Sequence, residues 1–228
     1  MKSAADRKLK TEHPPAPSFQ QVSHAKEEGM LENRDGWIGV DEAGRGPLAG
    51  PVVAAAVWMP PDFEPDGITD SKRMTPRARE EAAVRIKEGC RWGIGVVEVE
   101  EIDRLNILQA TLLAMRLAVG EVRKPYDGVL VDGNRPPPGL GAPVECVIRG
   151  DGRFAQIAAA SILAKTHRDS IMRTLAKEFP DYGFEHNFGY ATRGHISAIF
   201  TFGPSAIHRK TFNPVRAILT QPCLSFTR

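Results

Sequence analysis

Residues 37–58 read WIGVDEAGRGPLAGPVVAAAVW, and this stretch decides the fold. It begins with Trp37-Ile38-Gly39-Val40, which has the composition of a short buried strand, and ends with a second apolar run from Pro51 to Trp58. The turn between the two runs is too short for the crossover that parallel neighbours need. We therefore expect an antiparallel hairpin at one side of a mixed sheet.

Strands and helices alternate along the rest of the chain. We expect further strands at Arg91–Val99, Gly128–Val131 and Cys146–Ile148, and helices at Ser71–Gly89, Leu105–Val122 and Phe154–Phe179. In the first helix, Thr75 can act as the N-cap, Pro76 suits the first turn and Gly89 ends the helix. The pattern predicts the α/β class, with a mixed central sheet flanked by helices.

The composition is typical of a globular protein that needs no disulfide framework. Of the 228 residues, 42% are hydrophobic and 25% charged, and a chain of this length buries enough surface to fold unaided. The three cysteines are widely spaced and match no zinc pattern, which favours a reducing, cytoplasmic location. The longest apolar run is too short to cross a membrane, so no membrane partner is expected.

Residues 1–35 differ from the rest of the chain. They contain the Pro-rich segment 13–17, scattered charges and no apolar periodicity, a combination that favours disorder. We therefore expect a disordered N-terminal extension at residues 1–35, one domain at residues 36–219 and a tail at residues 220–228.

Acidic residues follow the ends of several expected strands. Asp41 and Glu42 come directly after the first strand, Asp132 directly follows the run GVLV, and Asp151 follows a third strand and an Arg-Gly pair. Such an all-oxygen set suits Mg²⁺ or Mn²⁺, and bunched carboxylates repel one another unless a cation or protons neutralise them. The alternative is that each aspartate only forms a turn, or that Asp151 caps the next helix. Glu42 favours the metal site, because glutamate is not a turn former.

The turn after Glu42 contains Gly44-Arg45-Gly46. Glycines on either side of an arginine let a ligand approach the backbone closely, and Arg45 adds a fixed positive charge suited to phosphate. The turn matches neither the dinucleotide-binding nor the P-loop pattern, which argues against a small-molecule kinase or dehydrogenase.

Seven stretches of the chain stand out in order over about residues 37–219: GVDEAGRGPLAGPVVAAAV, TDSKRMTPRARE, IDRLNILQATLLAM, VLVDGN, IRGDGRFAQIAAASILAKTHRD, DYGFEHNFGYATRGH and HRKTFNPVRAI. In these motifs and in their order, the chain resembles the type 2 ribonucleases H (ribonuclease HII). The resemblance implies a ribonuclease H-like fold with a C-terminal helical region.

The resemblance also implies roles for particular residues. Those in VDEAGRG, VDGN and GDGR would be the metal-binding catalytic carboxylates, namely Asp41, Glu42, Asp132 and Asp151. The turn formed by Gly44, Arg45 and Gly46 would contact the 2′-hydroxyl of the ribonucleotide at the cleavage point. Lys72 would meet a backbone phosphate, and Tyr190 would pack against the sugar of the neighbouring deoxynucleotide.

The activity implied is that of a metal-dependent endoribonuclease acting in DNA replication and repair. It would hydrolyse the RNA strand of RNA–DNA hybrids and cut on the 5′ side of single ribonucleotides in duplex DNA, leaving 5′-phosphate and 3′-hydroxyl ends. The cofactor would be Mn²⁺ or Mg²⁺, and the enzyme would be a monomer. A replication clamp as a protein partner is left open. Two alternatives are another metal nuclease, such as a DNA resolvase, and a non-catalytic module that binds RNA–DNA hybrids.

The sequence departs from the family's pattern at two places. Gly152 stands where the family more often has Ser or Ala, and Asn187-Phe188 replaces the Lys or Met that usually lies between His186 and Gly189. These departures put in doubt the loop that carries Asp151 and any role for His186.

Other polar residues have structural interpretations. Without the resemblance, Tyr190 would be half-buried core. The helix expected at residues 154–179 places Lys165 and Arg168 near one face, where they could follow a nucleic-acid backbone, but solvated charge is the default interpretation. Asp169 has Lys165 and Arg173 four residues to either side, which predicts a surface ion pair. His195 and His208 have no spacing that suggests a zinc pair, and are left as structural or substrate-facing residues.

Overall fold

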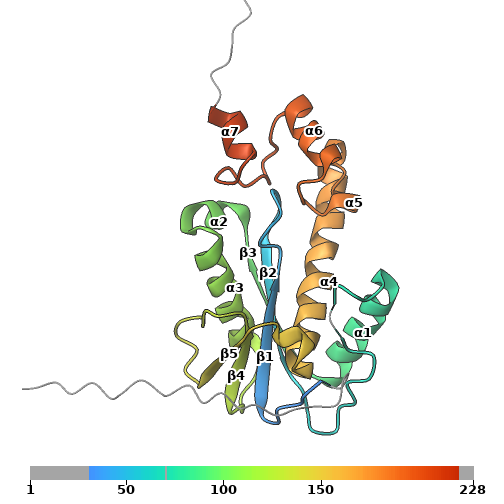
Figure 1. The fold of residues 1–228 in the computed structure, drawn as a ribbon, viewed down its shortest axis with the longest axis vertical. Helices are drawn as coiled ribbons and strands as arrows, with labels where there is room; N and C mark the ends of the chain where they lie inside the picture. The colour runs from blue at the N-terminus through green and yellow to red at the C-terminus, as the bar shows by residue number, and fades with distance from the viewer. Residues whose placement is uncertain (1–30, 70, 221–228) are drawn as a thin grey trace, which may run out of the picture. The chain divides into compact units, whose positions relative to one another are not determined.

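The protein, described by a computed structural model over residues 31–69 and 71–220, is built on a mixed sheet with strand order β3-β2-β1-β4-β5 (Figure 1). The strands are β1 (Trp37–Ala43), β2 (Val52–Trp58), β3 (Arg91–Val97), β4 (Gly128–Asp132) and β5 (Val144–Val147). The helices are α1 (Pro76–Gly89), α2 (Val99–Leu105), α3 (Ile107–Glu121), α4 (Ala155–Glu178), α5 (Phe184–Asn187), α6 (Arg193–Phe202) and α7 (Val215–Thr220), with 3₁₀ turns η1 (Gly150–Gly152) and η2 (Pro180–Tyr182).

The expected hairpin is confirmed, and it sits inside the mixed sheet as predicted. Strand β1 pairs antiparallel with β2 and parallel with β4, while β3 extends the antiparallel side and β5 the parallel side. Strand β1 runs on past Val40 to include Asp41, Glu42 and Ala43, which pair with the start of β2. The first acidic pair is therefore part of the strand.

Helices cover both faces of the sheet, with α3 on one side and α4 and α1 on the other (Figure 1). Glycines allow these helices to lie close to the strands. A Cβ on Gly39 would come within 2.2 Å of the α4 backbone, and one on Gly95 within 2.0 Å of the α3 carbonyl of Ala114. Any side chain at either position would force helix and sheet apart, so the alanine-rich helices and the strand glycines pack as matched surfaces.

Two helix predictions need correction. The segment expected as one helix, 105–122, is two elements, because Asn106 has a positive φ of 73° and breaks the chain direction between α2 and α3. The Asn106 side chain also caps α3, accepting hydrogen bonds from the backbone N–H groups of Leu108 and Gln109. Helix α1 begins at Pro76 rather than Ser71; the Thr75 cap is confirmed, since its hydroxyl accepts from the Ala78 N–H at 3.2 Å.

The N-terminal boundary also lies elsewhere than expected. Residues 31–35 were predicted to be part of the disordered extension, but Glu32 forms an isolated bridge with Phe154, and its N–H donates to the Arg153 carbonyl at 2.6 Å. The Gln156 amide donates to Asn33 and to the Arg34 carbonyl. These residues belong to the domain because they fasten the start of α4. Residues 1–30 of the expected extension lie outside the described residues.

The C-terminal helices form a separate apolar cluster at one end of α4 (Figure 1). Its buried members are Leu48, Ala49, Met172, Ala176, Tyr182, Phe184, Ile199 and Val215. The β1–β2 turn supplies two of them, so the C-terminal region packs directly against that turn. Of the expected tail, Thr220 is the last residue of α7 and residues 221–228 lie outside the described residues. In the described part of the chain, no helix is both long and apolar enough to span a membrane.

Candidate active site

The sheet register brings the first acidic residues together. Strands β1 and β4 are parallel neighbours, and Val40 is paired with Val131. The next residues along each strand, Asp41 and Asp132, therefore lie side by side where the β1–β4 pairing ends.

The fourth acidic residue reaches the same edge from a turn. Strand β5 is paired with β4, with Asp132 opposite Val147, and η1 follows it directly. The Gly150 N–H donates to Asp132 Oδ1 at 2.7 Å, which holds the turn carrying Asp151 beside β4. Asp151 does not cap α4, because Phe154 occupies the N-cap position and no side chain bonds there. A Cβ at Gly152 would meet nothing within 4 Å, so its difference from the family's Ser or Ala reflects no packing demand.

We call Asp41, Glu42, Asp132 and Asp151 the carboxylate cluster. Burial, followed by the charges of Glu42 and Asp132, raises the pKa of Asp41 well above its usual value. Burial is also the main cause that raises the pKa of Glu42 and of Asp132, and the charge of Asp151 adds to the shift at Asp132. The protein thus holds acidic groups where their ionised forms are costly, a cost that a cation would remove.

Each carboxylate has a partial partner of its own. The Glu42 N–H donates to Asp41 Oδ1 at 2.7 Å, and Arg45 lies 3.3 Å from Glu42. Lys72 Nζ lies 3.5 Å from Asp151 Oδ2. As they lie, no three acidic, histidine or cysteine side chains of residues 31–69 and 71–220 are arranged to hold a metal ion together.

The donor set nevertheless fits Mg²⁺ or Mn²⁺ in its chemistry. It is made only of carboxylate oxygens, the ligands that these ions prefer, and it comes from adjoining chain segments whose charges repel one another. Binding such an ion requires the side chains to turn away from their present partners.

The turn after the cluster contains two glycines with different roles. Gly44 has φ +98°, and a Cβ there would lie 2.2 Å from the Arg168 side chain, so the fold itself requires glycine. A Cβ on Gly46 would come no nearer than 3.8 Å to any atom, and that atom belongs to Tyr190. The protein could accommodate a side chain at Gly46, and its absence leaves the backbone open to a ligand beside Tyr190.

Two buried arginines hold this turn, and sequence reasoning missed both. Arg168 was expected to be solvated, but it is 1% exposed and donates to the carbonyls of Pro51, Ala49 and Phe188. Arg209 is 0% exposed and donates to the carbonyls of Gly44, Arg45, Gly50 and Pro51. We call these two residues the arginine pair.

The arginine pair is satisfied by backbone rather than by acids. Neither guanidinium forms an ion pair with a carboxylate of the described residues, although every guanidinium nitrogen donates to a carbonyl. Burial lowers the pKa of Arg168 to about 10, and burial followed by the charge of Arg168 lowers that of Arg209 to about 9. Both therefore stay charged at neutral pH and fix the shape of the turn.

Tyr190 lies at the surface and is anchored through its backbone. Its side chain is 44% exposed, which contradicts the alternative that it is core. His208 Nδ1 accepts from the Ser205 N–H at 2.9 Å, so its Nε2 carries the proton and donates to His195 Nε2 at 3.0 Å. His195 Nδ1–H then donates to the Tyr190 carbonyl at 2.8 Å. The two histidines, both buried, are structural and hold Tyr190 in place.

The structure also places the other polar residues that the sequence analysis discussed. Lys72 is a strongly exposed side chain within reach of Asp151, before the start of α1. Asp169 pairs with Lys165 at 2.7 Å as predicted, but it is buried, and its second partner is Arg79 rather than Arg173. His186 lies on the short helix α5 with its side chain 86% exposed.

Comparison with known proteins agrees with this geometry. The sequence matches the family model described as Ribonuclease HII over residues 38–215. Among curated proteins, Ribonuclease HII of Chlorobaculum tepidum is 54% identical over 179 residues, which make up 76% of this chain and 87% of that protein. Residues 38–215, which match the family model, include every residue of the carboxylate cluster and both residues of the arginine pair.

Solved structures share the fold. Ribonuclease H2 from Pyrococcus horikoshii OT3 superposes with a TM-score of 0.66 at 24% identity, covering 80% of this chain and 96% of that one. The RNase HII in a PCNA:RNase HII complex from Archaeoglobus fulgidus gives 0.60 at 25% identity, covering 82% and 98%. Bst-RNase HIII in complex with Mn²⁺ gives 0.60 at 17% identity, covering 80% and 68%. The sheet, its flanking helices and the C-terminal helices thus form a ribonuclease H-like fold.

Proposed function

The chain belongs to the ribonuclease HII family, and on this premise we propose that it hydrolyses the RNA strand of RNA–DNA hybrids and cuts on the 5′ side of single ribonucleotides in duplex DNA. Membership of the family makes the protein a nuclease. The finer substrate preference, the residue roles and the chemistry of the ends are our proposal. The observation that carries it is the meeting of four carboxylates from β1, β4 and η1 at one edge of the sheet.

In the proposed mechanism, the carboxylate cluster holds Mn²⁺ or Mg²⁺. When bound, such an ion would supply an activated water and would neutralise charge that develops on the phosphodiester. The Bst-RNase HIII structure in complex with Mn²⁺ supports a divalent cation in this fold. Asp41 and Asp132 leave neighbouring strands and form the fixed part of the site, while Asp151 approaches on η1. Hydrolysis by water leaves a 5′-phosphate and a 3′-hydroxyl, and the histidines, buried behind Tyr190, take no part.

Selection of the ribonucleotide is proposed to come from the turn and from Tyr190. The 2′-hydroxyl is the group that distinguishes RNA from DNA at a given position. Gly46 lies beside the Tyr190 ring, and its bare backbone leaves room for a sugar. Gly44 and Arg45 are held by Arg209 through their carbonyls, which keeps the turn from adapting to a deoxyribose. Tyr190 would pack against the sugar of the adjacent deoxynucleotide.

Lys72 is proposed to bind a phosphate of the cut strand. It lies beside Asp151 with an exposed side chain that can swing toward a ligand. The side chain is 81% exposed, so its ammonium group is accessible to a ligand at the surface.

The test is a duplex with one ribonucleotide, incubated with and without Mg²⁺ or Mn²⁺ and compared with an all-DNA duplex. We expect cleavage 5′ of the ribonucleotide, only with metal, and with little dependence on the base. The variant Tyr190→Ala should lower the ratio of junction cleavage to all-RNA hybrid cleavage while melting near the wild type, because the side chain is largely exposed. Binding without metal-dependent cleavage would favour a non-catalytic hybrid-binding module. Equal cleavage of the all-DNA duplex would favour another metal nuclease, such as a DNA resolvase.

A sliding clamp is proposed as a protein partner. The RNase HII of Archaeoglobus fulgidus was solved in a PCNA:RNase HII complex, and this chain covers 98% of that protein chain. Size-exclusion chromatography with the clamp of the same organism tests the proposal. A chain shortened to residue 220 shows whether residues 221–228 are needed. Separate elution of the full-length chain and the clamp would overturn it.

A further inference from the structure

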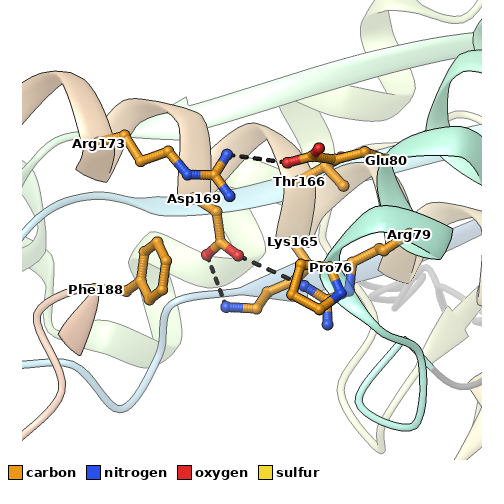
Figure 2. Close-up of a pocket in the computed structure, with 8 residues that line it drawn as sticks. All are labelled: Pro76, Arg79, Glu80, Lys165, Thr166, Asp169, Arg173 and Phe188. Carbon is orange, nitrogen blue, oxygen red and sulfur yellow. Dashed lines mark hydrogen bonds and ion pairs between the residues drawn. The ribbon is translucent and has the colours of Figure 1, made fainter. Parts of the chain in front are cut away.

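A cavity outside the carboxylate cluster is lined in part by Lys165 of α4. It has a volume of about 240 Å³ and lies between the first turn of α1, the middle of α4 and Phe188. Its lining residues are Pro76, Arg79, Glu80, Lys165, Thr166, Asp169, Arg173 and Phe188 (Figure 2). The cavity is smaller than the roughly 300–1,000 Å³ of typical small-molecule sites, so it suits one part of a larger ligand.

Three connections place this cavity next to the proposed cleavage site. Ser161 hydrogen bonds to Asp41, and Lys165 follows it by one helical turn on the same side of α4. Phe188 lies two residues before Tyr190, and its carbonyl is held by Arg168 of the arginine pair. Ser71, beside Lys72, shares a hydrogen bond with Ser161 at 2.9 Å. A strand contacting Lys72 and Tyr190 would pass over the cavity.

The cavity has one cation more than its acids can neutralise. Three basic side chains line it, against two acidic ones. The two innermost cations, Lys165 at 2.7 Å and Arg79 at 3.7 Å, both pair with the buried Asp169. Figure 2 shows these contacts converging on Asp169, with Arg173 reaching separately toward Glu80.

Arg173 is the cation that can change partners. Its contact with Glu80 is 3.2 Å long, and the two side chains are 47% and 58% exposed, so the pair contributes little to stability. The Phe188 ring forms the adjoining wall, with Lys165 Nζ 5.0 Å from its centre and the Arg173 guanidinium 6.0 Å away. This aromatic wall lies at the position where the sequence departs from the family's pattern, and both cations are close enough to the ring for a cation–π contact.

We propose that this cavity is a subsite for one backbone phosphate of the substrate strand, on the deoxyribonucleotide side of the junction. Arg173 leaves Glu80 to bind the phosphate, Lys165 supports it, and Phe188 contacts the adjoining sugar. A phosphodiester carries one negative charge, which matches the single excess cation. The proposal rests on the proposed function, because Tyr190 defines the deoxyribonucleotide side.

The experiment replaces one phosphate at a time by a neutral methylphosphonate. A set of duplexes with one ribonucleotide carries the neutral linkage at successive positions on its 3′ side. Binding is measured by fluorescence anisotropy in EDTA, so that no strand is cut. For the wild type we expect one position beyond the junction at which neutralisation weakens binding about threefold to tenfold. For Arg173→Gln, that position should no longer matter, and the slope of log K against log salt should fall by about one.

Two matched variants on α1 control this result. Glu80→Gln removes the acid that competes for Arg173 and should tighten binding. Arg77→Gln removes an exposed arginine that pairs with Glu81 outside the cavity, and should leave the methylphosphonate pattern unchanged. Melting curves check that the three variants fold, and since each residue is exposed or paired at the surface, each should melt with the wild type.

Either of two results would overturn the subsite. In the first, Arg173→Gln still binds less tightly when the same phosphate is neutralised. In the second, no single neutralised phosphate weakens binding of the wild type. Failure of the proposed function is a separate result, because cleavage is measured on the unmodified duplex with metal. An enzyme that cuts the ribonucleotide but shows no sensitive position retains the function and loses the subsite.

Discussion

Two groups of like charges are buried close together in this protein, and they are stabilised in opposite ways. The carboxylate cluster begins on β1 at Asp41, and the carbonyls that the arginine pair binds begin at Gly44, three residues on. In the cluster, burial and the charges of neighbouring acids raise the pKa values of Asp41 and Asp132, and few donors contact these acids. In the pair, burial lowers pKa values, yet every guanidinium nitrogen bonds to a backbone carbonyl.

The difference separates a binding site from a scaffold. A buried charge whose hydrogen-bonding capacity is filled by the backbone has nothing left for a ligand, and its loss leaves carbonyls unsatisfied. A buried charge that is poorly compensated retains affinity for an ion of opposite sign. We therefore expect removal of a carboxylate to abolish activity and spare the fold, and removal of an arginine to damage the fold first.

The largest effect is expected for Asp41→Asn. Asparagine keeps an oxygen that can accept the Glu42 N–H, so the local backbone should stay as it is. Loss of a metal ligand should lower turnover at least about a thousandfold, because metal contributes several kcal/mol of transition-state stabilisation. In metal-free buffer the variant should melt at or above the wild-type temperature, since a repelled charge is gone.

A metal titration sharpens this prediction. Mn²⁺ should raise the melting temperature of the wild type and leave that of Asp41→Asn unchanged. The control Asp62→Asn alters an exposed acid and should behave as the wild type in both assays. Wild-type turnover in Asp41→Asn would show that Asp41 is not a metal ligand needed for catalysis.

The next largest effect is expected for the arginine pair, where a substitution should change stability. Arg209→Met keeps much of the side chain's volume but removes the donors to four carbonyls. We expect the free energy of unfolding to fall by about 2–4 kcal/mol, because buried unsatisfied carbonyls are costly. Urea denaturation measures the change, with Arg77→Met as an exposed-arginine control. A variant of wild-type stability that still binds metal would show that the turn does not depend on Arg209.

The local patterns in the sequence predicted the parts of the site that depend on one segment at a time. Asp41, Glu42 and Asp132 could be identified because each follows a run of apolar strand residues, and the glycines of the turn are visible as letters. The burial of Arg168 could not be predicted in this way. Helix spacing gave it the same solvated character as Lys165, and only the carbonyls of the distant turn and of Phe188 make its burial possible.

The failures elsewhere have the same origin. Glu32 and Asn33 are polar and near a Pro-rich segment, yet both bond to residues around the start of α4. The partners are the backbone of Arg153 and Ala155 for Glu32, and the Gln156 side-chain amide for Asn33. Asn106 breaks a continuous apolar periodicity because it takes a positive φ and caps the following helix. Contacts between distant segments decided each case, and these are absent from any local pattern.

A smaller effect is expected on acidification, through the histidines that extend the scaffold. Burial, followed by the neighbouring His195, lowers the pKa of His208 to about 4 from its usual value near 6.5. The unfolded chain therefore binds a proton that the folded chain refuses between these values. Stability that is complete above about pH 6.5 is lost as the pH falls toward 4, by up to about 3 kcal/mol.

The variant His208→Gln isolates this contribution. Glutamine can accept from the Ser205 N–H and donate toward His195 without titrating. Its unfolding free energy should fall less steeply than that of the wild type between pH 6.5 and pH 4, in urea denaturation at fixed salt. The carboxylates titrate alike in both proteins, so the difference between the two slopes reports His208. Parallel slopes would mean that the histidine pair accepts a proton in the folded state.

The smallest effect distinguishes two N-terminal deletions. Removing residues 1–30 should change neither melting temperature nor turnover, because this Pro-rich, charged segment has no apolar periodicity with which to form a core. Removing residues 1–35 also deletes the hydrogen bonds from Glu32 and Asn33 to the loop after Asp151 and the start of α4. A loss of about 1–2 kcal/mol in stability is expected from a few such bonds. Because they fasten the residues that directly follow η1, which carries Asp151, turnover should fall in the longer deletion before the fold is lost, and metal should then bind less tightly. Equal behaviour of the two deletions would show that η1 holds Asp151 in place without the N-terminal residues.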